Sequence, residues 1–218
     1  MVRAVLWDND GVLVDSEQIF YEANRAYFAR HAVDLTQRDF FEWFLVQDCG
    51  AWNILAAQGM SGEQVAHCKA ERNALYMQRL LAGQPPATPG IEDILAALHT
   101  RVPMAVVTSS SPEHFATIHR ESGLMRYFDF VLTADRYERA KPAPDPYLKA
   151  LEILNLSPDE CVAVEDSPRG LAAARAAGVD CIVLRTALAG DYAFPGACRI
   201  VDSVAELSAV LEGMTCLP

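Results

Sequence analysis

The sequence predicts an α/β fold, in which a Rossmann-like parallel sheet carries helices on both faces and an α-helical cap domain is inserted after the first strand. A short apolar run at residues 3–7 predicts that first strand, and a long segment with helical spacing follows it. From residue 91 onward, helical patterns alternate with near-continuous apolar runs. Such runs between helices are typical of a parallel sheet that is covered on both faces.

The first strand ends in the most informative motif of the chain. Residues 3–7 read Arg-Ala-Val-Leu-Trp, which is typical of a buried strand, and Gly11 marks a sharp turn after it. Asp8 and Asp10 stand between the strand and the turn. Two carboxylates this close repel each other unless a cation offsets the repulsion. Mg²⁺ suits such oxygen ligands, and a carboxylate can also act as a nucleophile. The alternative is an ordinary acidic turn.

The segment after this motif predicts a helical insert. Aromatic and aliphatic residues recur at spacings of three and four, and Ser61 with Gln64 forms a capping-box pattern. A run rich in glycine and proline at residues 83–90 then ends the helical pattern. We expect helices at residues 16–30, 39–58 and 61–81.

The remainder of the chain alternates between helices and strands. We expect helices at residues 91–100, 112–122, 145–154, 168–177 and 204–211, and strands at residues 103–108, 129–132, 161–164, 180–184 and 199–201. The insert separates the first strand from its sheet partners. The economical arrangement is a core domain of residues 1–15 and 89–218 with a cap domain of residues 16–88. Ligands of open parallel sheets bind beyond the carboxyl ends of the strands.

Composition narrows the class of protein. Of 218 residues, 51% are hydrophobic and 22% charged, so the chain can bury a sizeable core. Eighteen basic residues against 29 acidic ones give a net charge of −11, and no block rich in lysine or arginine stands out. This balance argues against a nucleic acid or an anionic membrane as a partner. A small anionic substrate stays compatible, because a metal, a lysine and a helix N-terminus make one pocket locally positive.

The cysteines and the N-terminus bear on the compartment. Six cysteines are scattered without a Cys-x-x-Cys pair or a Cys/His cluster. The N-terminus leads directly into a strand without a signal-peptide pattern, and no apolar run approaches the roughly 20 residues that span a bilayer. We expect a reduced, cytoplasmic protein that is a monomer or a weak homodimer.

A second motif combines hydroxyl groups with a helix start. The predicted strand at residues 103–108 ends in Thr108, and Ser109, Ser110 and Ser111 lead into a helix. Hydroxyl groups and free backbone N–H groups at a helix start suit a phosphate. The alternative is that Ser110 or Ser111 simply caps the helix.

A third motif supplies a cation. Lys141 precedes two prolines, which stiffen the loop after it. There it would be a fixed positive charge that pairs with a nucleophilic carboxylate and a phosphoryl oxygen. Taken alone, a lysine of this kind is more often a solvated surface residue.

A fourth motif resembles the first, because two acids again follow an apolar strand. Glu165 and Asp166 follow a predicted buried strand, and a helix begins directly after them at Pro168. Beside Asp8 and Asp10, these two acids would complete an oxygen-rich cage for a hard cation. The alternative is that Asp166 or the serine after it caps the helix.

In this order, the four motifs resemble those of the haloacid dehalogenase superfamily, and more closely its phosphatase and β-phosphoglucomutase-like branch with a helical cap. The resemblance spans nearly the whole chain. It implies that Asp8 attacks phosphorus, while Asp10 protonates the leaving oxygen and then activates water. It also implies that Thr108 holds the phosphoryl group together with the N–H of Ser109, and that Lys141 neutralises the nucleophile and the phosphate.

The same resemblance implies Mg²⁺ as the cofactor. Asp166 would bind the ion together with Asp8 and the main-chain oxygen of Asp10, and Glu165 would bind it directly or through water. The family's dehalogenases lack the acid two residues after the nucleophile. Because Asp10 stands at that position, phosphoryl transfer is the better interpretation.

The expected function is therefore that of a Mg²⁺-dependent phosphatase. Its substrate would be a small phosphate monoester, such as a sugar phosphate or phosphoglycolate, hydrolysed through an aspartyl-phosphate. The nearest alternative is a phosphomutase of the β-phosphoglucomutase type. A catalytically silent phosphate-binding regulatory protein is a second alternative. A receiver-type signalling domain arranges its acids differently and leaves the helical insert unexplained.

The insert is less informative about the substrate. Trp43, Gln47, Trp52 and Asn53 are candidates for facing it, although an aromatic at helical spacing is more often part of a core. β-Phosphoglucomutases carry a histidine twelve residues after the nucleophile, where this chain has Phe20, so we expect hydrolysis rather than isomerisation. We also expect the insert to move as a lid, with hinges near residues 15–16 and 85–89.

Overall fold

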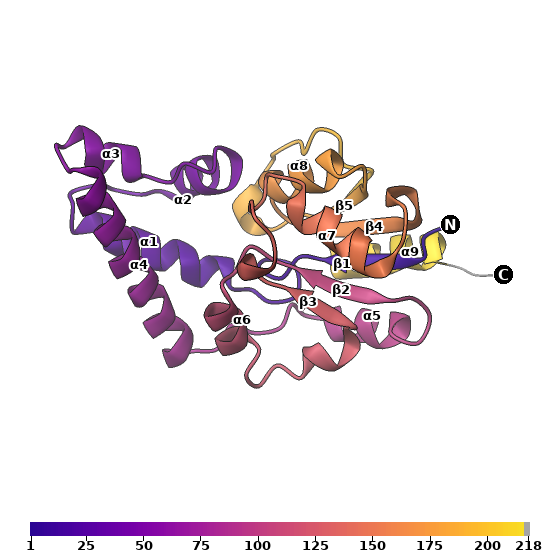
Figure 1. Ribbon diagram of the computed structural model, residues 1–218. Coiled ribbons are helices and arrows are strands. Elements are labelled where there is room, and N and C mark those ends of the chain that lie inside the picture. The colour runs from indigo at the N-terminus through magenta and orange to yellow at the C-terminus, as the bar shows by residue number, and fades with distance from the viewer. Residues whose placement is uncertain (216–218) are drawn as a thin grey trace.

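The computed structural model describes residues 1–215 and contains a parallel sheet (Figure 1). The sheet has six strands in the order β3-β2-β1-β4-β5-β6. The strands are β1 (Ala4–Trp7), β2 (Met104–Val107), β3 (Phe130–Leu132), β4 (Cys161–Glu165), β5 (Asp180–Leu184) and β6 (Arg199–Val201). β1 pairs with β2 on one side and with β4 on the other, so the first motif of the chain lies at the centre of the sheet. This confirms the predicted fold class.

Alternate residues of β1 enter two separate hydrophobic cores. Ala4 and Leu6 belong to one core, and Val5 and Trp7 belong to the other. Successive side chains of a strand point to opposite faces of the sheet. A strand with both faces covered must therefore be apolar throughout, which explains why this segment shows no alternation with polar residues.

Helices cover both faces of the sheet. One face packs against α7 (Asp145–Leu154) and α8 (Pro168–Ala176), and the other against α5 (Ile91–Leu98), α6 (Pro112–Ile118) and α9 (Val204–Thr215) (Figure 1). Short 3-10 helices at Leu124–Tyr127, Ala134–Arg136, Pro158–Glu160 and Ala187–Ala189 join several of these elements. α6 is shorter than the predicted helix at residues 112–122.

The helical insert forms a cap beside the sheet. Its helices are α1 (Glu17–Ala29), α2 (Gln37–Phe40), α3 (Trp52–Ala57) and α4 (Gly62–Ala82), with a π-helix at Phe41–Val46. Figure 1 shows them gathered on the left, where α4 adjoins α6 and the π-helix after α2 adjoins α8. α4 begins with the predicted capping box, in which the side chains and backbone N–H groups of Ser61 and Gln64 bond to each other.

The prediction of one helix over residues 39–58 is wrong. The structure has instead the short α2, the π-helix and then α3. The backbone between the π-helix and α3 takes positive φ angles at Asp48 (52°) and Gly50 (61°). Residues in the left-handed conformation end a right-handed helix. The helix is therefore interrupted here, although the apolar spacing in the sequence continues.

Two segments connect the cap to the core, and they lie side by side. Val14 forms an isolated antiparallel bridge with Ala87, and the Asp15 N–H donates to the Pro86 carbonyl at 3.0 Å. The chain thus leaves the core and re-enters it at the same place. This is where the sequence predicts the hinges.

None of the helices formed by residues 1–215 is both long and apolar enough to cross a membrane.

The described cysteines are free thiols. They are Cys49, Cys68, Cys161, Cys181 and Cys198. Cys216 lies outside the described residues.

Candidate active site

The carboxyl ends of β1, β2 and β4 bring the predicted motifs together. In the sheet, Trp7 stands beside Val106 of β2 and Val164 of β4. The first, second and fourth motifs each begin within two residues of this row. Asp8, Thr108 and Glu165 therefore meet at one edge, as expected for parallel strands.

Lys141 lies at the centre of the buried acids. Its Nζ donates to Asp8 Oδ1 at 2.9 Å, to Glu165 Oε1 at 2.6 Å and to the Val107 carbonyl at 2.8 Å. An ammonium group has three donors, and all three are used here. The lysine is only 3% exposed, so the alternative of a solvated surface residue is wrong.

The charges of this cluster are strongly coupled. Burial and repulsion from Glu165 raise the pKa of Asp8 to about 8, although Lys141 opposes the shift. Burial alone would lower the pKa of Lys141, but Asp8 and Glu165 outweigh it and raise that pKa instead. One ammonium group therefore offsets the repulsion among the buried acids only in part.

Glu165 is fixed by neighbours on several sides. Its Oε1 also accepts a hydrogen bond from the Tyr147 hydroxyl, and Oε2 lies 3.5 Å from Ser167 Oγ. A Cβ atom added to Gly170 would lie 1.8 Å from Glu165 Oε2. The carboxylate thus fills the space that a side chain at the first turn of α8 would need.

Asp166 carries a buried carboxylate oxygen that could accept a cation. Its Oδ2 is buried without a hydrogen-bond partner in the described chain. Burial and repulsion from Glu17 raise its pKa well above the usual value. Oδ2 also lies 2.0 Å from where a Cβ would stand on Gly11, whose φ of 79° favours glycine.

The donor set fits a hard divalent cation. Asp8, Glu165 and Asp166 each offer one oxygen, and these oxygens lie within 4.8 Å of one another. Carboxylate oxygens are the ligands that Mg²⁺ prefers, and the orphaned oxygen of Asp166 would gain a partner. The structure brings these three predicted ligands together. The side chain of Asp10, by contrast, is bound to hydroxyl groups.

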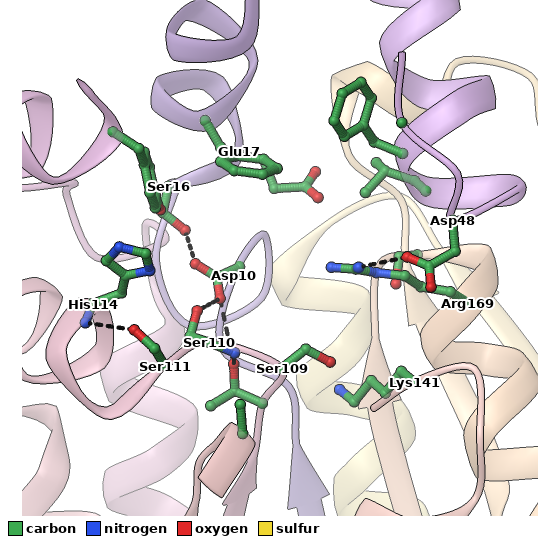
Figure 2. Close-up of a pocket in the computed structure, with 18 of the residues that line it drawn as sticks. Asp10, Ser16, Glu17, Asp48, Ser109, Ser110, Ser111, His114, Lys141 and Arg169 are labelled. Atoms are coloured by element: carbon green, nitrogen blue, oxygen red, sulfur yellow. Dashed lines mark hydrogen bonds and ion pairs between the residues drawn. The ribbon is translucent and has the colours of Figure 1, made fainter. Parts of the chain in front are cut away.

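Hydroxyl groups hold the Asp10 carboxylate on two sides (Figure 2). Ser16 donates to Oδ1, while Ser110 donates to Oδ2 at 2.8 Å and Thr108 lies 3.4 Å from Oδ2. Ser16 belongs to the start of the cap and the other two to the end of β2. The carboxylate is thereby held in the cavity beside Asp8.

The predicted phosphate-binding hydroxyls differ in their partners. Thr108 is fully buried, and its Oγ1 accepts from the Ser110 N–H at 3.0 Å. Ser109 lines the cavity, and its buried Oγ has no hydrogen-bond partner in the described chain. Ser111 caps α6 by accepting from the His114 N–H, so capping and an available hydroxyl occur together in this motif.

The cap supplies the opposite wall of the cavity, whose volume is about 410 Å³. Among the four cap residues predicted to face a substrate, only Trp52 lines this cavity. Trp43 packs against the hydrophobic core, and Gln47 and Asn53 are exposed. Trp43 thus follows the alternative given for an aromatic at helical spacing, and the structure does not bring Gln47 or Asn53 to the cavity.

Several residues of the wall were missed. Lys69, Arg72, Asn73 and Tyr76 line the cavity from one face of α4. Their spacing of three and four residues was a usable signal. The fold of the cap, however, decides which face of α4 meets the core. His114 of α6 joins them and packs against Tyr76, with 5.1 Å between ring centroids.

An ion pair in the lining of the cavity joins the cap to the core. Arg169 Nη1 of α8 lies 3.3 Å from Asp48 Oδ1, and Figure 2 shows the two side chains facing each other. Arg169 is partly buried against the cap.

Known proteins resemble this chain over most of its length. Protein CbbY of Cereibacter sphaeroides is 30% identical over 217 residues, which span 95% of this chain and 94% of that protein. Fructose-1-phosphate phosphatase YqaB of Escherichia coli is 29% identical over 183 residues, which span 83% and 95% of the two chains. The crystal structure of CbbY from Rhodobacter sphaeroides in complex with phosphate matches with a TM-score of 0.79 at 29% identity, covering 95% of this chain and 96% of that one.

The family itself follows from a match to most of the chain. The sequence model that describes haloacid dehalogenase-like hydrolases matches residues 2–178. That range includes the four motifs and the whole cap. The chain therefore belongs to the haloacid dehalogenase-like hydrolase family.

Proposed function

We propose that the chain is a Mg²⁺-dependent phosphatase that hydrolyses a small phosphorylated metabolite, of the sugar phosphate or phosphoglycolate type, through an aspartyl-phosphate. The observation that carries the proposal is the buried contact between Asp8 Oδ1 and Lys141 Nζ at 2.9 Å. It keeps a carboxylate at the end of β1 beside a fixed positive charge. The likeness to a named fructose-1-phosphate phosphatase supports the choice of substrate class.

In the first step, a carboxylate oxygen of Asp8 attacks phosphorus. The bond between phosphorus and the ester oxygen breaks, and Asp10 gives its proton to the leaving oxygen. Lys141 offsets the negative charge of the attacking carboxylate and of the phosphoryl oxygens. The free hydroxyl of Ser109 supplies one donor to those oxygens.

In the second step, water attacks the phosphorus of the aspartyl-phosphate. Asp10 takes a proton from that water, the bond from phosphorus to Asp8 breaks, and inorganic phosphate leaves. The hydroxyl groups of Ser16 and Ser110 keep Asp10 oriented for both proton transfers. A covalent intermediate of this kind divides a slow displacement into two faster ones.

The acids Asp8 and Asp166 would hold Mg²⁺ with the main-chain oxygen of Asp10, and Glu165 would join them directly or through water. When bound, the ion supplies positive charge that offsets the negative charge on the phosphoryl oxygens. Gly11 and Gly170 leave the room in which Asp166 and Glu165 keep their positions.

Hydrolysis is favoured over isomerisation by the environment of Phe20. Its ring packs against Phe40, Phe44 and Tyr76, with centroid distances of 5.8, 6.3 and 5.0 Å. It cannot exchange a proton with a sugar hydroxyl. A mutase of the β-phosphoglucomutase type would need such a group to pass the phosphoryl from one hydroxyl to another.

The test uses two substrates. With p-nitrophenyl phosphate, we expect turnover that needs Mg²⁺, is lost with EDTA and returns when Mg²⁺ is added back. A folded protein that never releases nitrophenol would overturn the proposal in favour of a silent binding protein. With β-glucose 1-phosphate, phosphorus NMR should show inorganic phosphate. Glucose 6-phosphate appearing faster than phosphate would favour the mutase.

A further inference from the structure

Within residues 1–215, two cationic side chains on the cap wall of the cavity have no acidic partner. Arg72 and Lys69 line the cavity from α4, and neither forms an ion pair with a carboxylate within residues 1–215. The other lysine and arginine of the cavity differ in this respect. Lys141 is paired with two acids, and Arg169 is paired with Asp48.

The guanidinium group of Arg72 is held in place by uncharged neighbours. Its Nη1 donates to the side-chain oxygen of the buried Asn24 at 2.9 Å. Its central carbon lies 4.7 Å from the ring centroid of Phe20 and 5.3 Å from that of Trp52. Its Nε is buried without a hydrogen-bond partner in the described chain. The group is thus oriented, yet it has donors to spare.

An oriented cation without an anion is costly to keep in a partly buried site. Burial lowers the pKa of Arg72 to about 10, which still leaves it charged at neutral pH. The pKa of His114 is lowered mainly by burial, and the positive charge of Arg72 lowers it further. An anionic group brought by a ligand would offset this cost.

We infer that Arg72, with Lys69 one helical turn before it, binds a second anionic group of the substrate, a phosphate or a carboxylate remote from the phosphoryl group that reacts. The inference rests on the proposed function, because the reacting group is assigned to Asp8 and Lys141 on the core wall. The two cations lie on the cap wall, and the cavity of about 410 Å³ that separates the walls suits a small metabolite.

The chemistry of the side chain suits this role. A guanidinium group presents a planar fork of N–H donors that matches a phosphate or a carboxylate. Stacking on Phe20 and Trp52 fixes that plane in advance, so little conformational entropy is lost when the anion binds. Lys69 adds a mobile positive charge, and its Nζ lies 5.6 Å from the ring centroid of Trp52.

The experiment compares matched substrates that differ in the second anion. Fructose 1,6-bisphosphate is compared with fructose 1-phosphate, and 6-phosphogluconate with glucose 6-phosphate. p-Nitrophenyl phosphate serves as a substrate without a second anion. The variants are Arg72→Met, which removes the charge, and Arg72→Lys, which keeps it. Arg79→Met is the matched control, because Arg79 lies on the same helix, pairs with Glu22 and does not line the cavity.

In the wild type, we expect kcat/KM to be higher for the substrate with two anionic groups in at least one pair. A preference in the fructose pair indicates a phosphate subsite, and a preference in the 6-phosphogluconate pair indicates a carboxylate subsite. Arg72→Met should lower kcat/KM for the preferred substrate about 10- to 100-fold, a much larger loss than it causes on p-nitrophenyl phosphate. Arg72→Lys should keep part of the preference, and Arg79→Met all of it. No preference in the wild type would overturn the inference, as would a preference that survives in Arg72→Met. An equal loss on all substrates would assign Arg72 a structural role only.

A binding measurement separates this inference from the proposed function. Fructose 1,6-bisphosphate should raise the melting temperature of the wild type more than fructose 1-phosphate does, and Arg72→Met should abolish the difference. This readout needs no turnover. If p-nitrophenyl phosphate is not hydrolysed but the difference is present, the proposed function fails and the anion subsite stands. If hydrolysis occurs without the difference, the subsite fails alone.

Discussion

His119 Nε2 lies 2.6 Å from the side-chain oxygen of Asn9, the residue between Asp8 and Asp10. The other ring nitrogen, Nδ1, lies 2.8 Å from Ser122 Oγ. Both imidazole nitrogens are thus engaged. The end of α6 thereby supports the turn that carries the two acids.

This contact predicts a pH dependence of stability. Burial lowers the pKa of His119 from 6.5 to about 4, so between these values the unfolded chain binds more protons than the folded chain. The folded state therefore loses stability as the pH falls through this window, by at most about 2 kcal/mol between pH 7 and pH 5. Chemical denaturation of the wild type and of His119→Gln at both pH values measures it.

The variant is needed because other groups act in the opposite direction. The raised pKa values of Asp8 (about 8) and Glu17 (about 7) make the fold more stable as the pH falls through them. Those contributions are common to both proteins and cancel in the difference. A difference in unfolding free energy that does not change with pH would contradict the role given to His119.

Asp8→Asn should remove turnover and keep the fold. The amide has nearly the shape of the carboxylate but cannot form the covalent intermediate, so kcat should fall by roughly 10⁴-fold or more. Because burial and Glu165 disfavour the Asp8 carboxylate, the variant should melt at least as high as the wild type in buffer without metal. Rates on p-nitrophenyl phosphate and circular-dichroism melts test both parts. Asp15→Asn, at an exposed acid, is the control.

Gly170→Ala should destabilise the protein, although alanine normally favours a helix. The added Cβ would meet Glu165 Oε2 at 1.8 Å, and that carboxylate is held by Lys141 and Tyr147. We expect a loss of about 1–3 kcal/mol in unfolding free energy. Gly213→Ala is the matched control, since nothing lies within 4 Å of its Cβ, and it should gain about 0.5–1 kcal/mol. Two variants with the same sign would refute the packing argument.

Asp48→Asn should weaken closure of the cap more than it weakens the fold. The ion pair with Arg169 joins cap and core, and pairs of this exposure contribute about 1 kcal/mol or less. KM for a sugar phosphate should rise a few-fold, while the midpoint of unfolding changes little. Arg139→Met, which breaks the Arg139–Asp145 pair within the core, should leave KM unchanged. An equal rise in KM for both variants would speak against a role in closure.

The sheet and the acid cluster are the parts that the sequence predicts well. Apolar strands that end in Asp8, Thr108 and Glu165 leave few arrangements other than a parallel sheet with these residues at one edge. The contact between Lys141 and Asp8 then follows from charge. These inferences depend on local pattern and on the geometry of strands, which the sequence carries directly.

The cap wall depends on tertiary packing instead. Apolar spacing predicts one helix over residues 39–58, because the spacing of apolar residues carries no information about the left-handed backbone at Asp48. The pairing of Asp48 with Arg169 joins residues 121 positions apart, and no local rule indicates it. Arg72 was missed for a related reason, since its stacking on Phe20 and Trp52 requires three segments of the cap to meet.

The bridge between Val14 and Ala87 has a consequence for protein engineering. An insertion whose two ends adjoin adds little loop-closure entropy when its length changes, and its replacement leaves the strands and their hydrogen bonds in place. Chimeras that join the core of this protein at this point to the cap of a relative should therefore fold. Exchange of this one continuous segment would transfer the substrate preference of the relative.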